Sequence, residues 1–312
     1  MSKRPKSSRS LRVGLVLGAG GPVGHAFHAG VLRALGEGLG WDARDADLVV
    51  GTSAGAQVGA LLRAGLSGED LAARASGHPL RPEAAEIARH YVRPNHKEPH
   101  PNAPRSRAPA APRFLLEALR RPAHFKPGRL VSALLPEGRV RLHAQAEGLR
   151  RVFGERWPER GLWITAVHLD SGDRVAFGAP GSPEVDVGTA VACSGAVPGV
   201  HEPVRWRGRR YVDGGVASAT HLDLLAESGL DVVVVSSPLS MFSAMRALLR
   251  SEIRRLERKV PVIAFEPRGE VLRVMGFNPM ALERSPAVAR AAFETALKDL
   301  DAPEKKPLRD LA

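Results

Sequence analysis

Short apolar runs alternate along the chain with segments in which apolar residues recur at helical spacing. Residues 12–17 form a short apolar run typical of a strand, a glycine-rich stretch follows, and residues 25–35 have helical spacing. Residues 47–50 and 56–64 repeat this strand and helix, and Gly65 is expected to end the second helix. Strands that alternate with helices are typical of a parallel sheet covered on both faces.

The same alternation returns in the second half of the chain. Apolar β runs at 162–169 and 174–178 are joined by D-S-G-D, a sequence typical of a hairpin turn, and residues 209–212 form another strand. Residues 231–236 and 261–265 are runs of the kind expected in central strands buried on both faces. Helical spacing predicts three further helices, at 186–193, 222–228 and 241–256.

The helix predicted at 241–256 is amphipathic. Apolar residues, Leu248 among them, mark one face, and arginines mark the opposite face. We expect this helix to pack on the sheet with its arginines in solvent. The whole pattern predicts an α/β fold, a three-layer α/β/α sandwich around a mainly parallel central sheet.

Proline and charge divide the chain into segments. We predict a disordered basic tail at 1–11, a single domain at 12–300 and a C-terminal tail at 301–312. Within the domain, prolines and arginines crowd residues 78–129 too closely for a long helix or a central strand. This segment is expected to be an insertion that borders the entrance to a functional site.

Composition excludes several classes of protein. With 312 residues, 44% of them hydrophobic, the chain can fold around a large core, and disorder of the whole chain is excluded. A single cysteine, Cys193, forms neither an internal disulfide nor a cysteine zinc cluster. We find no convincing set of metal ligands, and expect no cofactor and no requirement for calcium.

The net charge of +12 is concentrated in two segments. Residues 1–12 carry five basic residues and no acid, and residues 89–129 carry ten basic residues against two acids, so the remainder is 12 − 5 − 8 = −1. Such segments suit an anionic partner. We expect peripheral contact with an anionic membrane surface, whereas the few aromatic residues among the basic ones argue against nucleic acid.

The sequence also bears on localisation. No apolar run approaches the roughly 18 to 20 residues that span a bilayer. The basic start followed by an apolar run imitates a secretory signal, but glycines interrupt it and a cleavage site is lacking. We therefore predict a cytoplasmic protein and not a secreted one.

The pentapeptide G-T-S-A-G, from Gly51 to Gly55, lies between a predicted strand and a predicted helix. In that context G-x-S-x-G is typical of a nucleophilic serine held on a sharp turn, because glycines on both sides let the chain reverse. The helix that starts there brings backbone N–H groups close to any oxyanion that forms. Ser53 is therefore the candidate nucleophile, although a packing turn rich in small residues has the same sequence.

A glycine-rich loop, G-A-G-G-P-V-G from Gly18 to Gly24, also follows a strand and opens a helix. Its N–H groups can bind a phosphate or a developing oxyanion. The dinucleotide fingerprint fits poorly, because Val23 occupies the position of its third glycine. A P-loop is excluded because no Gly-Lys-Ser/Thr ends the loop.

A nucleophilic serine needs a base. Asp213 follows the β run R-R-Y-V and precedes Gly214 and Gly215, at a strand end where the chain can turn closely around the serine. The alternative is an ordinary turn aspartate. Among the histidines, His221 stays open as a third member of the site.

Four motifs together resemble the patatin-like phospholipases: the glycine loop with H-A-G-V-L-R-A-L behind it, G-T-S-A-G, C-S-G-A-V-P-G-V-H-E-P-V from Cys193, and Y-V-D-G-G from Tyr211. The resemblance covers residues 13–235 apart from the insertion. It implies a lipid acyl hydrolase of the phospholipase A, lysophospholipase or esterase type that uses a Ser-Asp dyad. Ser53 would be the nucleophile, Asp213 the base, and the N–H groups of Gly20 and Gly21 the oxyanion hole.

The chain departs from the family at Pro22-Val23, where the family commonly has a small residue followed by Arg or Lys. The departure removes a positive side chain that would hold a substrate phosphate, and Arg33 is a candidate to replace it. An acyltransferase or thioesterase with the same dyad, and a weak or inactive lipid-binding or nucleotide-binding protein, stay open as alternatives. The sequence leaves the head group, the acyl chain and the oligomeric state undetermined.

Overall fold

The computed structural model describes residues 11–91, 108–111 and 133–311. Most of the predicted basic tail and most of the predicted insertion lie outside the described residues. The described residues of the insertion include the helix Pro82–His90, which begins at a proline, a residue that has no N–H to satisfy in the first turn. No helix in the described ranges is long and apolar enough to cross a membrane.

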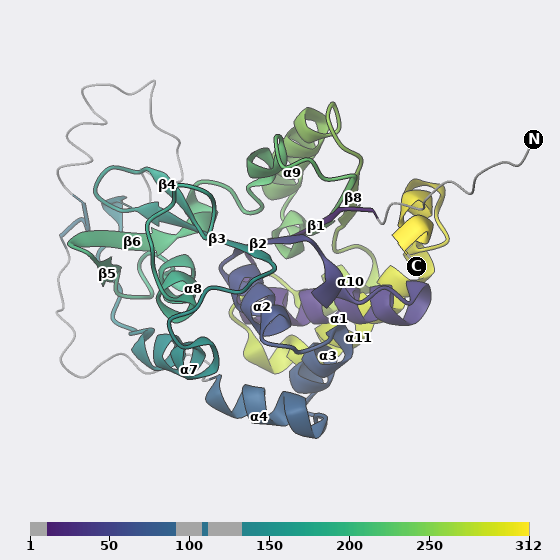
Figure 1. The fold of residues 1–312 in the computed structure, drawn as a ribbon, viewed down its shortest axis with the longest axis horizontal. Helices are drawn as coiled ribbons and strands as arrows, with labels where there is room; N and C mark the ends of the chain where they lie inside the picture. The colour runs from purple at the N-terminus through teal and green to yellow at the C-terminus, as the bar shows by residue number, and fades with distance from the viewer. Residues whose placement is uncertain (1–10, 92–107, 112–132, 312) are drawn as a thin grey trace, which may run out of the picture.

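One mixed sheet organises the domain, with the strand order β5-β6-β3-β2-β1-β7-β8 and β4 paired to β3 (Figure 1). Strands β3, β2, β1, β7 and β8 are parallel, whereas β4 and β6 run antiparallel to β3, and β5 antiparallel to β6. The strands are β1 Val13–Leu17, β2 Leu48–Thr52, β3 Gly161–His168, β4 Arg174–Phe177, β5 Val204–Trp206, β6 Arg209–Asp213, β7 Val232–Ser236 and β8 Val262–Phe265.

Helices cover both faces of the sheet, so the predicted three-layer α/β sandwich is confirmed (Figure 1). Alternate residues of β7 face opposite layers: Val234 packs in the larger core with α1 and α11, and Val233 in the smaller core with α9. The α-helices are α1 Gly21–Leu39, α2 Ala54–Arg63, α3 Gly68–Ser76, α4 Pro82–His90, α7 His143–Phe153, α8 Val187–Gly195, α9 Ser243–Leu256, α10 Glu270–Met275 and α11 Ser285–Asp299.

Three sequence expectations need correction. The helix predicted at 222–228 is a short 3-10 helix, η4 Leu222–Leu225. The strand predicted at 261–265 is β8, an edge strand whose burial alternates, because the sheet ends there in the described part of the chain. Leu248 is 58% exposed on α9, since this helix uses only Leu249 and Leu256 as fully buried contacts.

The segment expected as a C-terminal tail forms a 3-10 helix, η7 Pro303–Leu311, against the edge of the sheet. Leu308 is buried in the larger core. The Lys305 ammonium donates to the Ala264 carbonyl and lies 4.5 Å from the centre of the Phe265 ring. Burial lowers the pKa of Lys305 to about 8. The segment thus packs against β8.

Candidate active site

Ser53 occupies a strained turn between β2 and α2. Its φ of 55° and ψ of −116° lie outside the regions that L residues ordinarily adopt. The Ser53 N–H donates to the Ser194 hydroxyl at 2.8 Å, so α8 helps to hold the turn. This conformation costs about 1 to 3 kcal/mol, which the surrounding packing has to offset.

The two glycines of G-T-S-A-G are required by the space around them. A Cβ on Gly51 would lie 2.6 Å from the Ala56 Cα, and a Cβ on Gly55 would lie 1.9 Å from the Leu17 carbonyl oxygen. Both obstacles are backbone atoms, which cannot move aside as a side chain can. The turn that carries Ser53 therefore packs directly on β1. The two glycines let the chain reverse there because they have no side chain to collide with the neighbouring backbone.

Asp213 lies beside Ser53 because of the strand register. Thr52 pairs with Thr165 on β3, and the next residue of β3, Ala166, pairs with Asp213 on the antiparallel strand β6. The Asp213 carboxylate accepts hydrogen bonds from the Ser53 hydroxyl and, at 2.7 Å, from the Gly215 N–H. The structure thus brings together the two side chains that the sequence selected.

The glycines after Asp213 let the chain leave β6 close to its neighbours. A Cβ on Gly214 would lie 2.5 Å from the Thr165 Oγ1, and a Cβ on Gly215 would lie 3.0 Å from the Asp213 Oδ1. A larger residue at either position would displace the carboxylate or the strand that carries it. This close approach gives the Asp-Gly-Gly sequence its physical reason.

Burial raises the pKa of Asp213 to about 6, against the lowering effect of its hydrogen bonds from Ser53 and Gly215. Asp213 is 5% exposed, so little water solvates its charge. A carboxylate of raised pKa is a stronger base than an ordinary aspartate and is still ionised at neutral pH. Asp213 is therefore a stronger base than an exposed aspartate, although it is still weak beside a serine hydroxyl.

The glycine loop leads from β1 into α1 and is fixed by backbone hydrogen bonds. The Gly18 N–H donates to the Ser236 carbonyl at 3.0 Å, and the Ala19 N–H to the Ala219 carbonyl at 2.9 Å. A Cβ on Gly20 would lie 2.6 Å from the Pro238 Cγ, and one on Gly24 would lie 3.0 Å from the same atom. The loop therefore has little room to move.

Two helix N-termini converge on the site. α1 begins at Gly21 and α2 at Ala54, directly after Ser53. Within the described chain, no hydrogen bond occupies the N–H groups of Gly20 and Gly21. Free N–H groups and the positive ends of two helix dipoles favour negative charge beside the serine.

A buried histidine supports the glycine loop from behind. Its Nε2–H donates to the Gly18 carbonyl at 2.8 Å, and its Nδ1 accepts from the Ser236 hydroxyl at 2.7 Å. The carbonyl has no proton to give, which sets the tautomer. Burial lowers the pKa of this residue, His28, to about 4, against the raising effect of its bond to Gly18. His28 is therefore neutral in the folded protein.

His28 is expected to make the fold sensitive to acid. The unfolded chain takes up the proton near pH 6.5, whereas the folded chain does so only near pH 4. The free energy of unfolding therefore falls by about 3 kcal/mol as the pH drops through this window. Asp213 acts in the opposite sense, because its raised pKa adds stability as the pH falls from about 6 to 3.8.

Urea unfolding across this pH range isolates the contribution of His28. His28→Gln replaces the imidazole with a neutral amide and leaves Asp213 in place. We expect the variant to be less stable than the wild type at neutral pH, and the difference to shrink by about 3 kcal/mol towards pH 4. Parallel curves for the two proteins would show that His28 is not the acid-sensitive group.

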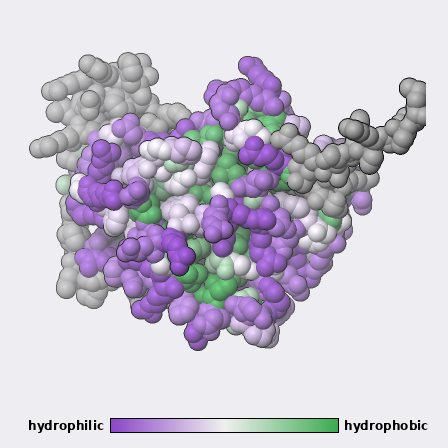
Figure 2. Space-filling model, in the orientation of Figure 1, coloured by the Kyte–Doolittle hydropathy of each residue, from purple (hydrophilic) through white to green (hydrophobic). Residues whose placement is uncertain are grey.

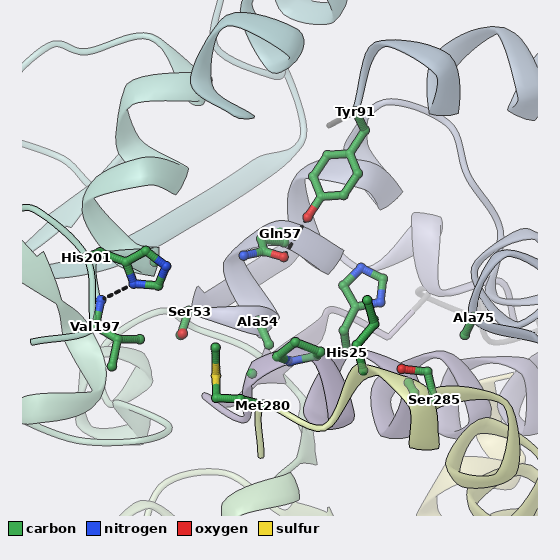
Figure 3. Close-up of a pocket in the computed structure, with 15 residues that line it drawn as sticks. His25, Ser53, Ala54, Gln57, Ala75, Tyr91, Val197, His201, Met280 and Ser285 are labelled. Atoms are coloured by element: carbon green, nitrogen blue, oxygen red, sulfur yellow. Dashed lines mark hydrogen bonds between the residues drawn. The ribbon is translucent and has the colours of Figure 1, made fainter. Parts of the chain in front are cut away.

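The Ser53 side chain lies at one end of a largely apolar pocket (Figure 3). In this view Ser53 and His201 lie at one end, and Ser285 and Ala75 at the other. The pocket is lined by Gly21, Pro22, His25, Ala26, Ser53, Ala54, Gln57, Ala75, Tyr91, Gly195, Val197, His201, Met280, Leu282 and Ser285. Its shape and lining suit an extended apolar group attached to a polar one.

A chain of polar side chains closes one wall of the pocket. The Tyr91 hydroxyl donates to the Gln57 Oε1 at 2.5 Å and accepts from the Gln145 Nε2 at 3.1 Å. The Arg74 guanidinium lies 4.5 Å from the centre of the Tyr91 ring. Because the Gln57 oxygen is engaged, its amide nitrogen faces the end of the pocket near Ser53 (Figure 3).

The structure places other candidates away from the pocket. Val23 is fully buried, because α1 begins at Gly21 and turns this side chain into the core. Arg33 pairs with Glu37 at 2.8 Å and does not line the pocket, so it is no substitute for a phosphate-binding residue there. His221 donates to the Gly214 carbonyl at 3.0 Å and also lies outside the pocket lining.

Several pocket residues were not anticipated from the sequence. His25 and His201 line the pocket although neither was selected from the sequence, and the His201 Nδ1 accepts from the Val197 N–H at 3.1 Å. The C-S-G-A-V-P-G-V-H motif did point to this region. No sequence pattern pointed to Met280 and Leu282, because they lie far along the chain from every motif. No group of three metal-ligating side chains is present among the described residues.

The comparisons with known proteins agree with the motifs. Among solved structures, VipD from Legionella pneumophila matches with 14% identity over 94% of this chain and 67% of that chain, at a TM-score of 0.45, a likeness too distant to argue from. No curated protein matches the chain. A family model described as patatin-like phospholipase matches residues 15–226. Because that match spans more than half of the chain and includes both the glycine loop and the Asp-Gly-Gly sequence, this protein belongs to the patatin-like phospholipase family.

Proposed function

We propose that the protein is a lipid acyl hydrolase of the phospholipase A, lysophospholipase or esterase type, with Ser53 as nucleophile and Asp213 as base. The observation that carries the proposal is the hydrogen bond from the Ser53 hydroxyl to the buried Asp213 carboxylate, at a strained turn that opens into an apolar pocket. A hydroxyl on a strained turn, a buried carboxylate and an apolar lining then occur together.

In the first half of the reaction, Asp213 takes the Ser53 proton as the hydroxyl oxygen attacks the ester carbonyl carbon. The carbonyl oxygen becomes an oxyanion, which the N–H groups of Gly20 and Gly21 are positioned to bind at the start of α1. Collapse of the intermediate breaks the ester bond. The leaving alcohol takes the proton from Asp213, and the acyl group stays on Ser53.

In the second half, water attacks the acyl-serine ester and gives its proton to Asp213. The new oxyanion accepts hydrogen bonds from the same N–H groups. Its collapse releases the fatty acid, and the proton on Asp213 returns to the Ser53 oxygen. Each N–H donor to an oxyanion contributes on the order of 3 kcal/mol to lowering the barrier. The glycine loop therefore has to supply what a carboxylate base lacks in strength.

The pH dependence of hydrolysis tests the role of Asp213. Since burial raises the pKa of Asp213 to about 6, kcat/KM is expected to fall tenfold per pH unit below pH 6 and to level off above it. The measurement is a pH-rate profile with a short-chain aryl ester. Asp213→Asn cannot accept the proton and is expected to reduce the rate to near background at every pH.

The outcomes separate the proposal from its alternatives. A midpoint near pH 4, or activity retained by Asp213→Asn, would mean that another group is the base. Acyl transfer to an added alcohol in preference to water would identify an acyltransferase. A wild-type protein that binds lipid and turns over neither the aryl ester nor phospholipid would be the inactive binding protein instead.

We also propose that the substrate is a lipid in an anionic membrane surface. The net charge of +12 supports this partner, at roughly 1 kcal/mol for each well-placed Lys or Arg. Most of the basic residues at 89–129 lie outside the described residues, so the proposal rests on charge. Equal binding to neutral and anionic vesicles would overturn it.

A further inference from the structure

One aromatic side chain in the described part of the protein is almost entirely in solvent. Phe277 is 90% exposed, more than any other large apolar residue described there. The others are Leu11, Leu134, Leu135, Leu248 and Leu282, between 37% and 58% exposed. Single exposed apolar residues are common, so exposure by itself does not indicate a function.

Phe277 belongs to a loop that also forms part of the pocket wall. The loop, residues 276–282, connects α10 with the 3-10 helix η6 Leu282–Arg284. Met280 and Leu282 line the pocket that contains Ser53, and Leu282 is 46% exposed. The loop thus belongs both to the outer surface and to the pocket wall, and Figure 3 shows Met280 at the same end of the pocket as Ser53.

The loop is held at its middle, and a hydrogen bond joins the segments on either side of it. The Pro279 carbonyl accepts from the Val23 N–H at 3.1 Å, which ties the loop to the start of α1. The Arg284 guanidinium, after the loop, donates to the Val274 carbonyl, before the loop, at 3.1 Å. Within the loop, the Met280 N–H donates to the Asn278 Oδ1 at 3.0 Å. These bonds hold the loop so that the Phe277 side chain stays in solvent, where it can contact another molecule.

The place of the loop favours a lipid surface over a second copy of the chain. Met280 and Leu282 of this loop line the pocket that contains Ser53, so a bilayer that contacts the loop lies next to the proposed lipid site. Two arginines near the loop are paired, Arg273 with Glu270 and Arg268 with Asp299, so the contact is expected to depend on apolar side chains rather than on charge. An exposed aromatic residue suits the boundary between head groups and acyl chains.

We propose that loop 276–282 docks the protein on a lipid bilayer, with Phe277 entering the acyl region and Leu282 and Met280 guiding an acyl chain towards Ser53. The proposal rests on the proposed function, because it assigns the route by which a lipid reaches that site. Figure 2 shows that the face seen in that view is mostly hydrophilic, with limited hydrophobic surface at its centre and lower edge.

Vesicle partitioning of a non-hydrolysing protein tests the docking step alone. In the Ser53→Ala background, Phe277→Ser is expected to lower partitioning onto phosphatidylcholine vesicles, with and without phosphatidylglycerol, by roughly tenfold. The matched control is Leu248→Ser, because Leu248 is 58% exposed on α9 and does not line the pocket. This control is expected to change partitioning by less than about twofold. Thermal unfolding of each variant reports whether it is folded.

A second measurement locates the contact directly. Cys193 is fully buried and burial raises the pKa of its thiol, so a cysteine introduced at the surface reacts selectively with an environment-sensitive fluorophore. Label on Phe277→Cys is expected to shift its emission to the blue when vesicles are added. Label on Leu248→Cys is expected to show no shift.

The outcomes distinguish the docking loop from the proposed function. Unchanged partitioning of Phe277→Ser, or an equal loss for Leu248→Ser, would overturn the docking loop. A wild-type dimer that Phe277→Ser converts to monomer, without any loss of vesicle binding, would make a second copy the partner instead. Absence of hydrolysis by the wild type would overturn the proposed function, while partitioning of the Ser53→Ala protein would still decide the docking loop.

Discussion

Ser53→Ala is expected to lower kcat/KM for a short-chain aryl ester by about 10⁴-fold or more. The variant loses the oxygen that would form the acyl intermediate, so what remains comes only from the oxyanion donors and from substrate binding. The carboxylate of Asp213 stays in place and loses the hydrogen bond that Ser53 donates. Alanine is strained in this backbone conformation to about the same degree as serine, so the substitution adds no strain and the variant is expected to fold.

Two measurements check this result. Steady-state hydrolysis gives the loss of rate, and reaction with a fluorophosphonate probe shows whether the labelled serine disappears. Ser228→Ala is a suitable control, because this half-buried serine donates to the Leu225 carbonyl at 2.7 Å and does not line the pocket. Labelling and turnover that persist in Ser53→Ala would place the nucleophile elsewhere in the chain.

Gly55→Ala is expected to destabilise the fold by more than about 4 kcal/mol. The added Cβ would lie 1.9 Å from the Leu17 carbonyl oxygen, in the centre of the sheet. Both groups are backbone or attached directly to it, so relief requires α2 to move away from β1. That movement would also displace Ser53, which begins the same turn.

Gly36→Ala is the matched control for this substitution. Gly36 is an exposed helical residue of α1 whose added Cβ would have no atom closer than 4.0 Å. Alanine is the better helix former by about 1 kcal/mol, so this variant is expected to be slightly more stable than the wild type. Chemical unfolding of both variants gives the comparison. A Gly55→Ala protein of wild-type stability would show that the turn that carries Ser53 is looser than its packing indicates.

The sequence carried enough information to select Ser53 and Asp213 as partners because both depend on local rules. A serine between glycines at the end of a strand, and an aspartate before two glycines at the end of another, are recognisable without knowledge of the fold. The antiparallel direction of β6 was not recognisable in this way, since strand direction depends on pairing with β3. The pairing of β6 with β3 then places Asp213 beside the end of β2.

Local sequence patterns could not predict which residues form the pocket wall. Met280 and Leu282 enter the pocket through the packing of loop 276–282 on α1, which no periodicity reports. The position of Val23 shows the same limit. A start of the first helix at residue 25 leaves residue 23 in the loop, whereas the observed start at Gly21 directs its side chain into the core. The helix thus begins about one turn earlier than predicted, which places the Val23 side chain in the core.

The long separation of the pocket residues along the chain has a consequence for protein synthesis. Ser53 and Asp213 are 213 − 53 = 160 positions apart, and Leu282 completes the wall later still. A growing chain emerges from the ribosome in that order, and contacts between distant segments form late. The nascent enzyme therefore has no competent site until nearly all of the domain has been made. Under the proposed function, incomplete chains would therefore not hydrolyse lipid.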